Sequence, residues 1–232
     1  MSKKFIFLFL LFNAHPIFAR TLSQLQSDTR SLVSDANSNR QLFTNQQITD
    51  FLNAGQKFAI NQTWCLAQNV QFQLSIGTTY YAVPNDFLAI NRLTLNGLIL
   101  NQESPAALDS KSEGWQLSSG IPTYYFIDFS SSNYVGFTPV PVDSTSTGTI
   151  SMDYYQQPTD MVNPTDEPFN GVTSMQGYGY ILPYYAASQM SAIEQQSSLT
   201  SFYMQMYSQA VTLLGQKCRN NPNYLPSFSA HE

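Results

Sequence analysis

The chain has 232 residues, which is enough for one domain or two small ones and for a sizeable hydrophobic core. Only 11% of its residues are charged, so its surface must consist mainly of neutral polar side chains. The net charge is -5, and no basic stripe of the kind that grips nucleic-acid phosphates occurs in the sequence. A neutral, tyrosine-rich surface costs little to desolvate, which favours contact with other proteins. An ordinary low-charge globular protein with no special partner is the alternative.

Residues 1–19 have the outline of a secretory signal. Lys3 and Lys4 precede an apolar run over residues 5–12, and Ala19 offers a small side chain before a cleavage point. The run is too short to span a bilayer. This leader is therefore a signal, an uncleaved apolar segment that docks on a partner, or a misassigned start.

Two helices are predicted after the leader. Thr21 with Gln24 has the pattern of a capping box, and apolar residues then recur at helical spacing. Thr44 with Gln47 begins the second helix in the same way, and this helix should run to about residue 64. Its buried stripe is expected to comprise Ile48, Phe51, Leu52, Phe58 and Ala59.

From about Val70 the hydrophobic period changes to two, which is typical of half-buried strands. Asn96-Gly97 is the strongest hairpin signal in the sequence. Residues 101–120 are polar and are predicted to form a loop, with Trp115 isolated among them. Strands are expected over residues 70–76, 79–83, 89–95, 121–129 and 149–155, and another is expected to begin at residue 134. Short strands at this spacing favour an antiparallel sandwich or barrel.

Helical signals return after an irregular stretch over residues 158–179. Pro183 suits the first turn of a third helix, and a break at residues 197–200 precedes a fourth helix. Residues 219–232 form a C-terminal tail whose apolar side chains, spaced by prolines, fit a docking segment. These candidate docking residues are Tyr224, Leu225 and Phe228. A frayed terminus is the alternative.

The predicted fold class is α+β, with an antiparallel β-sandwich or barrel module inserted between helices 2 and 3 of a four-helix bundle. The predicted parts are a leader over residues 1–19, helices 1 and 2 over 20–66, the β-module over 67–180, helices 3 and 4 over 181–218, and the tail over 219–232.

The sequence offers no convincing catalytic residues. The two histidines, His15 and His231, lie in the leader and in the tail, where neither can be held rigidly beside a nucleophile. There is no glycine-rich phosphate loop, so we expect neither an enzyme nor a cofactor. Cys65 and Cys218 lack the partners of a metal site and are expected either to form a disulfide or to be two free buried thiols.

Carboxylates are the one remaining group for chemistry. Asp153, Asp160, Asp166 and Glu167 cluster around the last strand and its exit, with Asn163 among them. They could act as a glycosidase pair or bind a cation, but the spacing lacks the regularity of a calcium loop. Turn formation, which Asp, Asn and Pro favour on their own, is the simpler interpretation, and we expect no metal.

Tyrosines occur in pairs at residues 80–81, 124–125, 154–155 and 184–185. Neighbouring strand residues face opposite sides of a sheet, so each strand pair should place one ring in the core and one outside. The outer rings are candidates for an interface or a ligand surface.

The order of several motifs resembles the head–tail adaptor, or head-completion, proteins of tailed bacteriophages. The resemblance covers residues 20–226. The motifs that carry it are Arg20–Leu25, Ile48–Gln56, Thr78–Phe87, Gly120–Thr123, Asp153–Pro158 and Leu182–Ala187. No single motif is specific, and it is their order around one β-module that points to the family.

This resemblance implies a structural virion protein that assembles in the host cytoplasm. Such connector proteins form a ring, twelve-fold in the family, beneath the portal protein. They extend the DNA channel without sequence-specific DNA binding and give tail tube or nozzle proteins a platform. By similarity, the helices and the tail would contact the portal and neighbouring subunits, the β-module would face the tail side, and no membrane would be involved. The leader motivates an alternative, an exported β-rich binding or adhesive protein.

Overall fold

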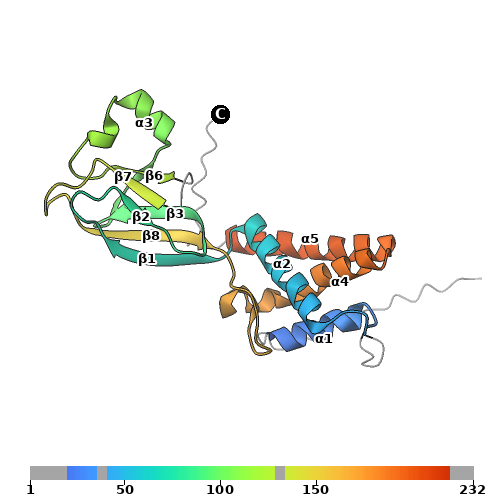
Figure 1. The fold of residues 1–232 in the computed structure, drawn as a ribbon. Helices are drawn as coiled ribbons and strands as arrows, with labels where there is room; N and C mark the ends of the chain where they lie inside the picture. Colours follow the sequence, from blue (N-terminus) through green and yellow to red (C-terminus); the bar gives the residue numbers. More distant parts are fainter. Residues whose placement is uncertain (1–19, 36–40, 129–133, 220–232) are drawn as a thin grey trace, which may run out of the picture.

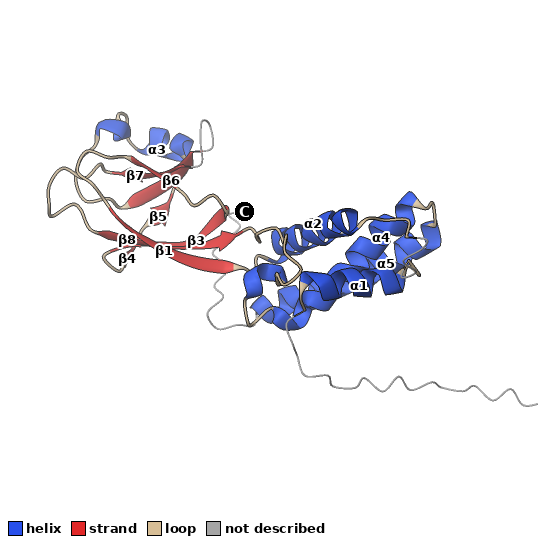
Figure 2. Ribbon diagram, turned by 60° about the horizontal axis from the view of Figure 1, so that its bottom comes forward, coloured by secondary structure: helices blue, strands red, loops and turns tan. Residues whose placement is uncertain are grey.

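The computed structural model describes residues 20–35, 41–128 and 134–219, and its fold class is α+β. The sheets lie at one end of the molecule and the long helices at the other (Figures 1 and 2). The α-helices are α1 (Leu22–Leu32), α2 (Asn45–Thr63), α3 (Pro105–Lys111), α4 (Leu182–Ile193) and α5 (Ser197–Arg219). The strands are β1 (Ala67–Gln73), β2 (Tyr80–Ala82), β3 (Phe87–Leu95), β4 (Leu98–Ile99), β5 (Asn101–Gln102), β6 (Tyr124–Asp128), β7 (Tyr134–Thr138) and β8 (Thr149–Gln156).

Both predicted capping boxes are present. The Thr21 amide donates to Gln24 Oε1 at 2.9 Å, and the Thr44 amide donates to Gln47 Oε1 at 2.8 Å. These contacts satisfy amides that a helix start otherwise leaves unpaired, which fixes where α1 and α2 begin.

One hydrophobic core joins α1, α2, α4 and α5. Leu25, Leu52, Ala186 and Tyr207 contribute one fully buried side chain from each helix. The Tyr207 hydroxyl donates to the Gly55 carbonyl at 2.7 Å, so even the polar atom of this large side chain is satisfied inside the core.

The buried stripe of α2 differs from the prediction at Phe58, whose side chain is 44% exposed. The buried face of α2 runs through Leu52, Ala59 and Ile60, and a rotation of about 100° per residue places Phe58 outside that face. The position on that face is filled instead by Gln56, which is fully buried and hydrogen-bonded.

Within the described residues, eight strands form two four-stranded sheets, ordered β1-β8-β3-β4 and β2-β7-β6-β5. Their facing sides share a second core, to which Leu93, Val135, Phe137, Ile150 and Met152 contribute side chains with almost no exposure. The expectation of purely antiparallel pairing was wrong at one edge, because β5 pairs with β6 in parallel.

Residues 101–120 are more ordered than the predicted loop. They contain β5, α3 and a 3₁₀ turn at Trp115–Leu117. The Trp115 indole is buried, donates to Asp109 at 2.7 Å and meets the Phe126 ring edge to face at 5.1 Å. Trp115 therefore attaches α3 to the sheet that contains β6, and the polar composition of the segment concealed this anchor.

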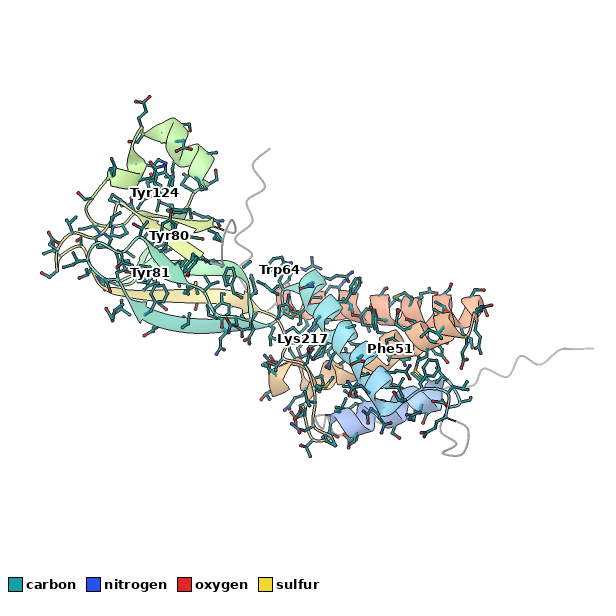
Figure 3. The ribbon with its side chains drawn as sticks, in the orientation of Figure 1. Phe51, Trp64, Tyr80, Tyr81, Tyr124 and Lys217 are labelled. Carbon is teal, nitrogen blue, oxygen red and sulfur yellow. A yellow bond between two sulfur atoms is a disulfide. The ribbon has the colours of Figure 1, made fainter. Side chains whose placement is uncertain are left out.

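The tyrosine pairs follow the predicted alternation in part. Tyr80 is exposed and Tyr81 half-buried, and all three labelled tyrosines lie in the β-rich end of the molecule (Figure 3). The pair at residues 154–155 departs from the predicted alternation, because both rings are buried. Tyr155 packs against the Trp64 ring at 5.4 Å, so the helical end covers the face that alternation assigned to solvent.

Candidate interaction surfaces

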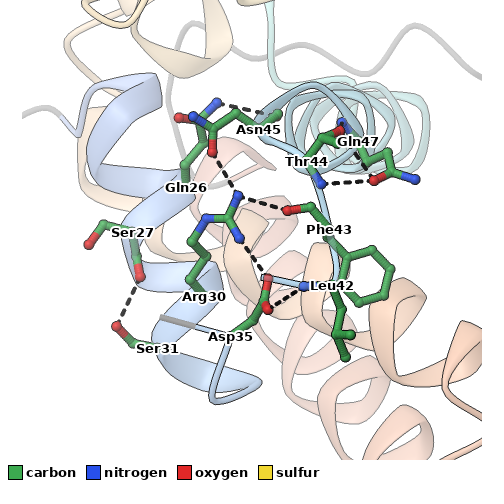
Figure 4. Close-up of polar contacts among 10 residues, drawn as sticks. All are labelled: Gln26, Ser27, Arg30, Ser31, Asp35, Leu42, Phe43, Thr44, Asn45 and Gln47. Atoms are coloured by element: carbon green, nitrogen blue, oxygen red, sulfur yellow. Dashed lines mark hydrogen bonds and ion pairs between the residues drawn. The ribbon is translucent and has the colours of Figure 1, made fainter. Parts of the chain in front are cut away.

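A buried ion pair at the end of α1 is linked by hydrogen bonds to the start of α2. The Arg30 guanidinium lies 2.6 Å from Asp35 Oδ2 and also donates to the Phe43 carbonyl at 2.9 Å and to Asn45 Oδ1 at 2.7 Å (Figure 4). Asp35 in turn accepts from the Leu42 amide at 2.8 Å. Every charged oxygen and nitrogen named here has a partner, which is the condition for burying a charge pair. The network is structural rather than a reactive site.

Two buried amides of α2 hold the segment that leaves β8. Asn53 both donates to and accepts from the backbone of Met161, at 3.0 and 2.9 Å. Gln56 donates to the Thr159 carbonyl at 2.9 Å and accepts from the Phe169 amide at 3.0 Å. Residues 157–167, the first part of this connection between the sheets and α4, form no helix or strand but are fixed by side chains of α2, and 3₁₀ turns at Pro168–Gly171 and Gln176–Ile181 follow.

Cys65 and Cys218 form a disulfide with a Cα–Cα distance of 5.5 Å. Of the two expectations for these residues, the disulfide is therefore the one found, and not two free buried thiols. The bond joins the segment between α2 and β1 to the end of α5. Trp64, which ends α2 in the left-handed conformation, lies beside it where the helices meet the sheets (Figure 3). The connection from α2 to the sheets is therefore anchored covalently to α5.

The carboxylates around residues 160–167 already have partners. Asp160 lies 2.7 Å from Lys57 Nζ. Asp166 accepts from the amides of Val162 and Asn163 at 2.8 and 2.7 Å, and these hydrogen bonds lower the pKa of its carboxyl. Over the described ranges, no three His, Cys, Asp or Glu side chains lie close enough together to hold a metal ion. The contacts are those of a turn stabilised by its own side chains.

Several sequence candidates lie outside the described residues. These are the leader, His15, His231 and the docking residues Tyr224, Leu225 and Phe228. None of the helices in the described part of the chain combines the length and apolar character needed to cross a bilayer.

Apolar side chains are exposed on turns and edges of the β-rich end. Leu117 is 89% exposed and Leu98 73%, and large apolar side chains are also exposed at Ile76, Ile99, Ile121 and Val142. Sequence periodicity could not single most of these out, because turns and two-residue strands have no period to read. It was wrong for Ile76, which was assigned to a strand over residues 70–76, whereas β1 ends at Gln73. Single exposed apolar side chains are ordinary on a protein surface, so these residues mark a contact surface only where they gather into one patch.

The described residues therefore combine well-satisfied cores with exposed apolar side chains at the β-rich end. A family comparison identifies the class of protein. A model of the SU10 adaptor protein family matches residues 20–225, and the chain belongs to this family of phage head–tail adaptors. A comparison with curated proteins gave no significant match.

Proposed function

We propose that the chain is a subunit of a homo-oligomeric ring that lies beneath the portal, extends the DNA channel and carries the tail. The observation that supports this most is the family match over residues 20–225, which spans both the helices and the sheets. The ring is proposed to be a dodecamer through which DNA passes without sequence-specific contacts. The low charge of the chain, with ten basic residues, suits a channel wall that does not bind DNA tightly.

We also propose how the parts divide this work. The shared core of α1, α2, α4 and α5 supports a four-helix bundle, and the facing sheets support a sandwich inserted between α2 and α4. In the proposed arrangement, residues 20–66 and 181–218 contact the portal and neighbouring subunits. Residues 67–180 face the tail proteins with their exposed apolar side chains, and residues 219–232 dock on the portal or on a neighbour.

The test mixes purified protein with its portal and examines the products by negative-stain electron microscopy. A ring of this chain on the portal is expected, and failure to form any ring or complex over a range of salt concentrations would refute the proposal. A triple alanine variant at Tyr224, Leu225 and Phe228 should lose portal binding, because it removes the apolar anchors. A matched double alanine variant at Ser227 and Ser229 should retain binding.

The family match does not support the exported binding or adhesive protein that the leader suggested, and one measurement can test the leader directly. Mass spectrometry of the mature N-terminus distinguishes a virion protein from an exported one. An intact Met1 agrees with a virion protein assembled in the cytoplasm, whereas a start at Arg20 would favour export.

A further inference from the structure

β1 is a sheet edge with an open side. Across the described ranges, the only strand paired with its seven residues is β8, whereas the other edge strands, β2, β4 and β5, have two or three residues each. Its sequence, Ala-Gln-Asn-Val-Gln-Phe-Gln, contains no charge and no proline. Soluble proteins usually protect long edge strands with one or the other, because an open edge invites another strand. The β1 edge therefore has the properties of a site for strand addition.

The pairing with β8 shows which backbone groups of β1 remain open. Leu66 bonds to Gln156 at one end of the pairing, and Leu74 bonds to Gly148 at the other. In an antiparallel pair the bonded residues alternate, so the even-numbered residues of β1 point their backbone groups at β8. The odd-numbered residues point theirs away, and these are Ala67, Asn69, Gln71 and Gln73.

The chain that follows α5 starts beside β1. The disulfide places the Cα atom of Cys218 5.5 Å from that of Cys65, which is two residues before the first residue of β1. α5 runs toward the sheets, and its last residue is Arg219 (Figure 1). A chain that continued in this direction would start near the first residue of β1 and would run parallel to that strand.

Residues 220–232 have a pattern that fits an edge strand. Pro222 and Pro226 are separated by four positions, so in an extended chain their missing amides fall on the same side. Proline is tolerated in an edge strand when that side faces solvent. The opposite side, which presents residues 223, 225, 227 and 229, has an intact amide at every position.

We propose that residues 223–229 add to the open edge of β1 in the same chain as a parallel strand. In a parallel pair, the residues of the added strand that hydrogen-bond to β1 are the odd-numbered ones. Their side chains lie on the opposite face of the sheet from the side chains of the odd-numbered residues of β1. Leu225 then lies on the face of the half-buried Val70 and Phe72, and Tyr224 and Phe228 lie on the outer face. The short tether, closed by the disulfide, favours this intrachain contact over capture of another copy.

The added strand would protect the edge while the subunit is free. It would keep the open sides of two β1 strands from pairing with each other, and it would leave β1 when the segment binds elsewhere. The added strand is proposed for the free subunit alone. If it does not form, the proposed contact of residues 219–232 with the portal is unaffected.

The test measures amide hydrogen exchange by NMR on the oxidised full-length chain, at a concentration where sedimentation shows a monomer. A variant that ends at Arg219 is the comparison. The amides of Asn69, Gln71 and Gln73 should exchange at least about tenfold faster in the truncated variant. The amides of Val70 and Phe72, which bond to β8, should change much less, so the expected signature alternates along one strand.

A substitution pair at one position gives the control. Ser227→Pro removes an amide that faces β1 and should reproduce the faster exchange, whereas Ser227→Ala keeps the amide and should not. Equal exchange of the odd-numbered amides in the full-length and truncated chains would overturn the proposal. Protection that appears only as protein concentration rises would also overturn it, because the occupant would then be a second copy.

Discussion

The Arg30 network gives the sharpest stability prediction. In Arg30→Ala, the Asp35 carboxylate remains buried, with a side chain only 4% exposed, and keeps the Leu42 amide as a hydrogen-bond donor. The variant also loses the Arg30 contacts to the Phe43 carbonyl and to Asn45. Removing one partner of a buried pair costs about 3–5 kcal/mol, which for a chain of this size corresponds to a fall in Tm of roughly 10 °C.

Urea denaturation followed by circular dichroism measures this free energy. The matched control is Arg20→Ala, which breaks the ion pair with Asp28 where both side chains are 42% exposed and should cost less than about 1 kcal/mol. The double variant Arg30→Met with Asp35→Leu should be more stable than Arg30→Ala, because no unpaired charge is left inside. If Arg30→Ala costs no more than Arg20→Ala, the reasoning is refuted.

Three further predictions use the same denaturation assay. Gly136→Ala should cost about 1–3 kcal/mol, because the added Cβ would lie 2.2 Å from Phe126 Cζ, and Phe126→Leu should then recover part of the loss. Burial raises the pKa of Tyr125 to about 12, so its contribution to stability should be intact below about pH 10 and lost as pH rises toward 12; a Tyr125→Phe variant that shows the same loss would contradict this. Cys218→Ser should cost about 5 kcal/mol in the chain-entropy model for a bridge with a sequence separation of 153, and a reductant should shift the parent chain but not the variant.

Local signals predicted the helix starts well. Thr21 and Thr44 cap their helices as expected, because a capping box depends on side chains only three residues apart. The α+β class followed in the same way from the change of hydrophobic period near Val70.

Longer-range features could not be read from the same patterns. Gln56 is buried because distant backbone groups at Thr159 and Phe169 satisfy it, and no local pattern reveals such partners. Trp115 is buried because Phe126 lies across the fold from it. The cysteine pairing is of the same kind, since only the fold brings the ends of two helices together.

The two connections between helices and sheets have a mechanical consequence. One passes through Cys65, which is bonded to α5, and the other passes through residues 159–161, which Asn53 and Gln56 hold against α2. Swinging the sheets about these connections would have to distort segments that the disulfide and several buried hydrogen bonds hold against the helices. The subunit should therefore transmit force as one stiff lever, and a load on the sheets should reach the helices without a hinge to absorb it.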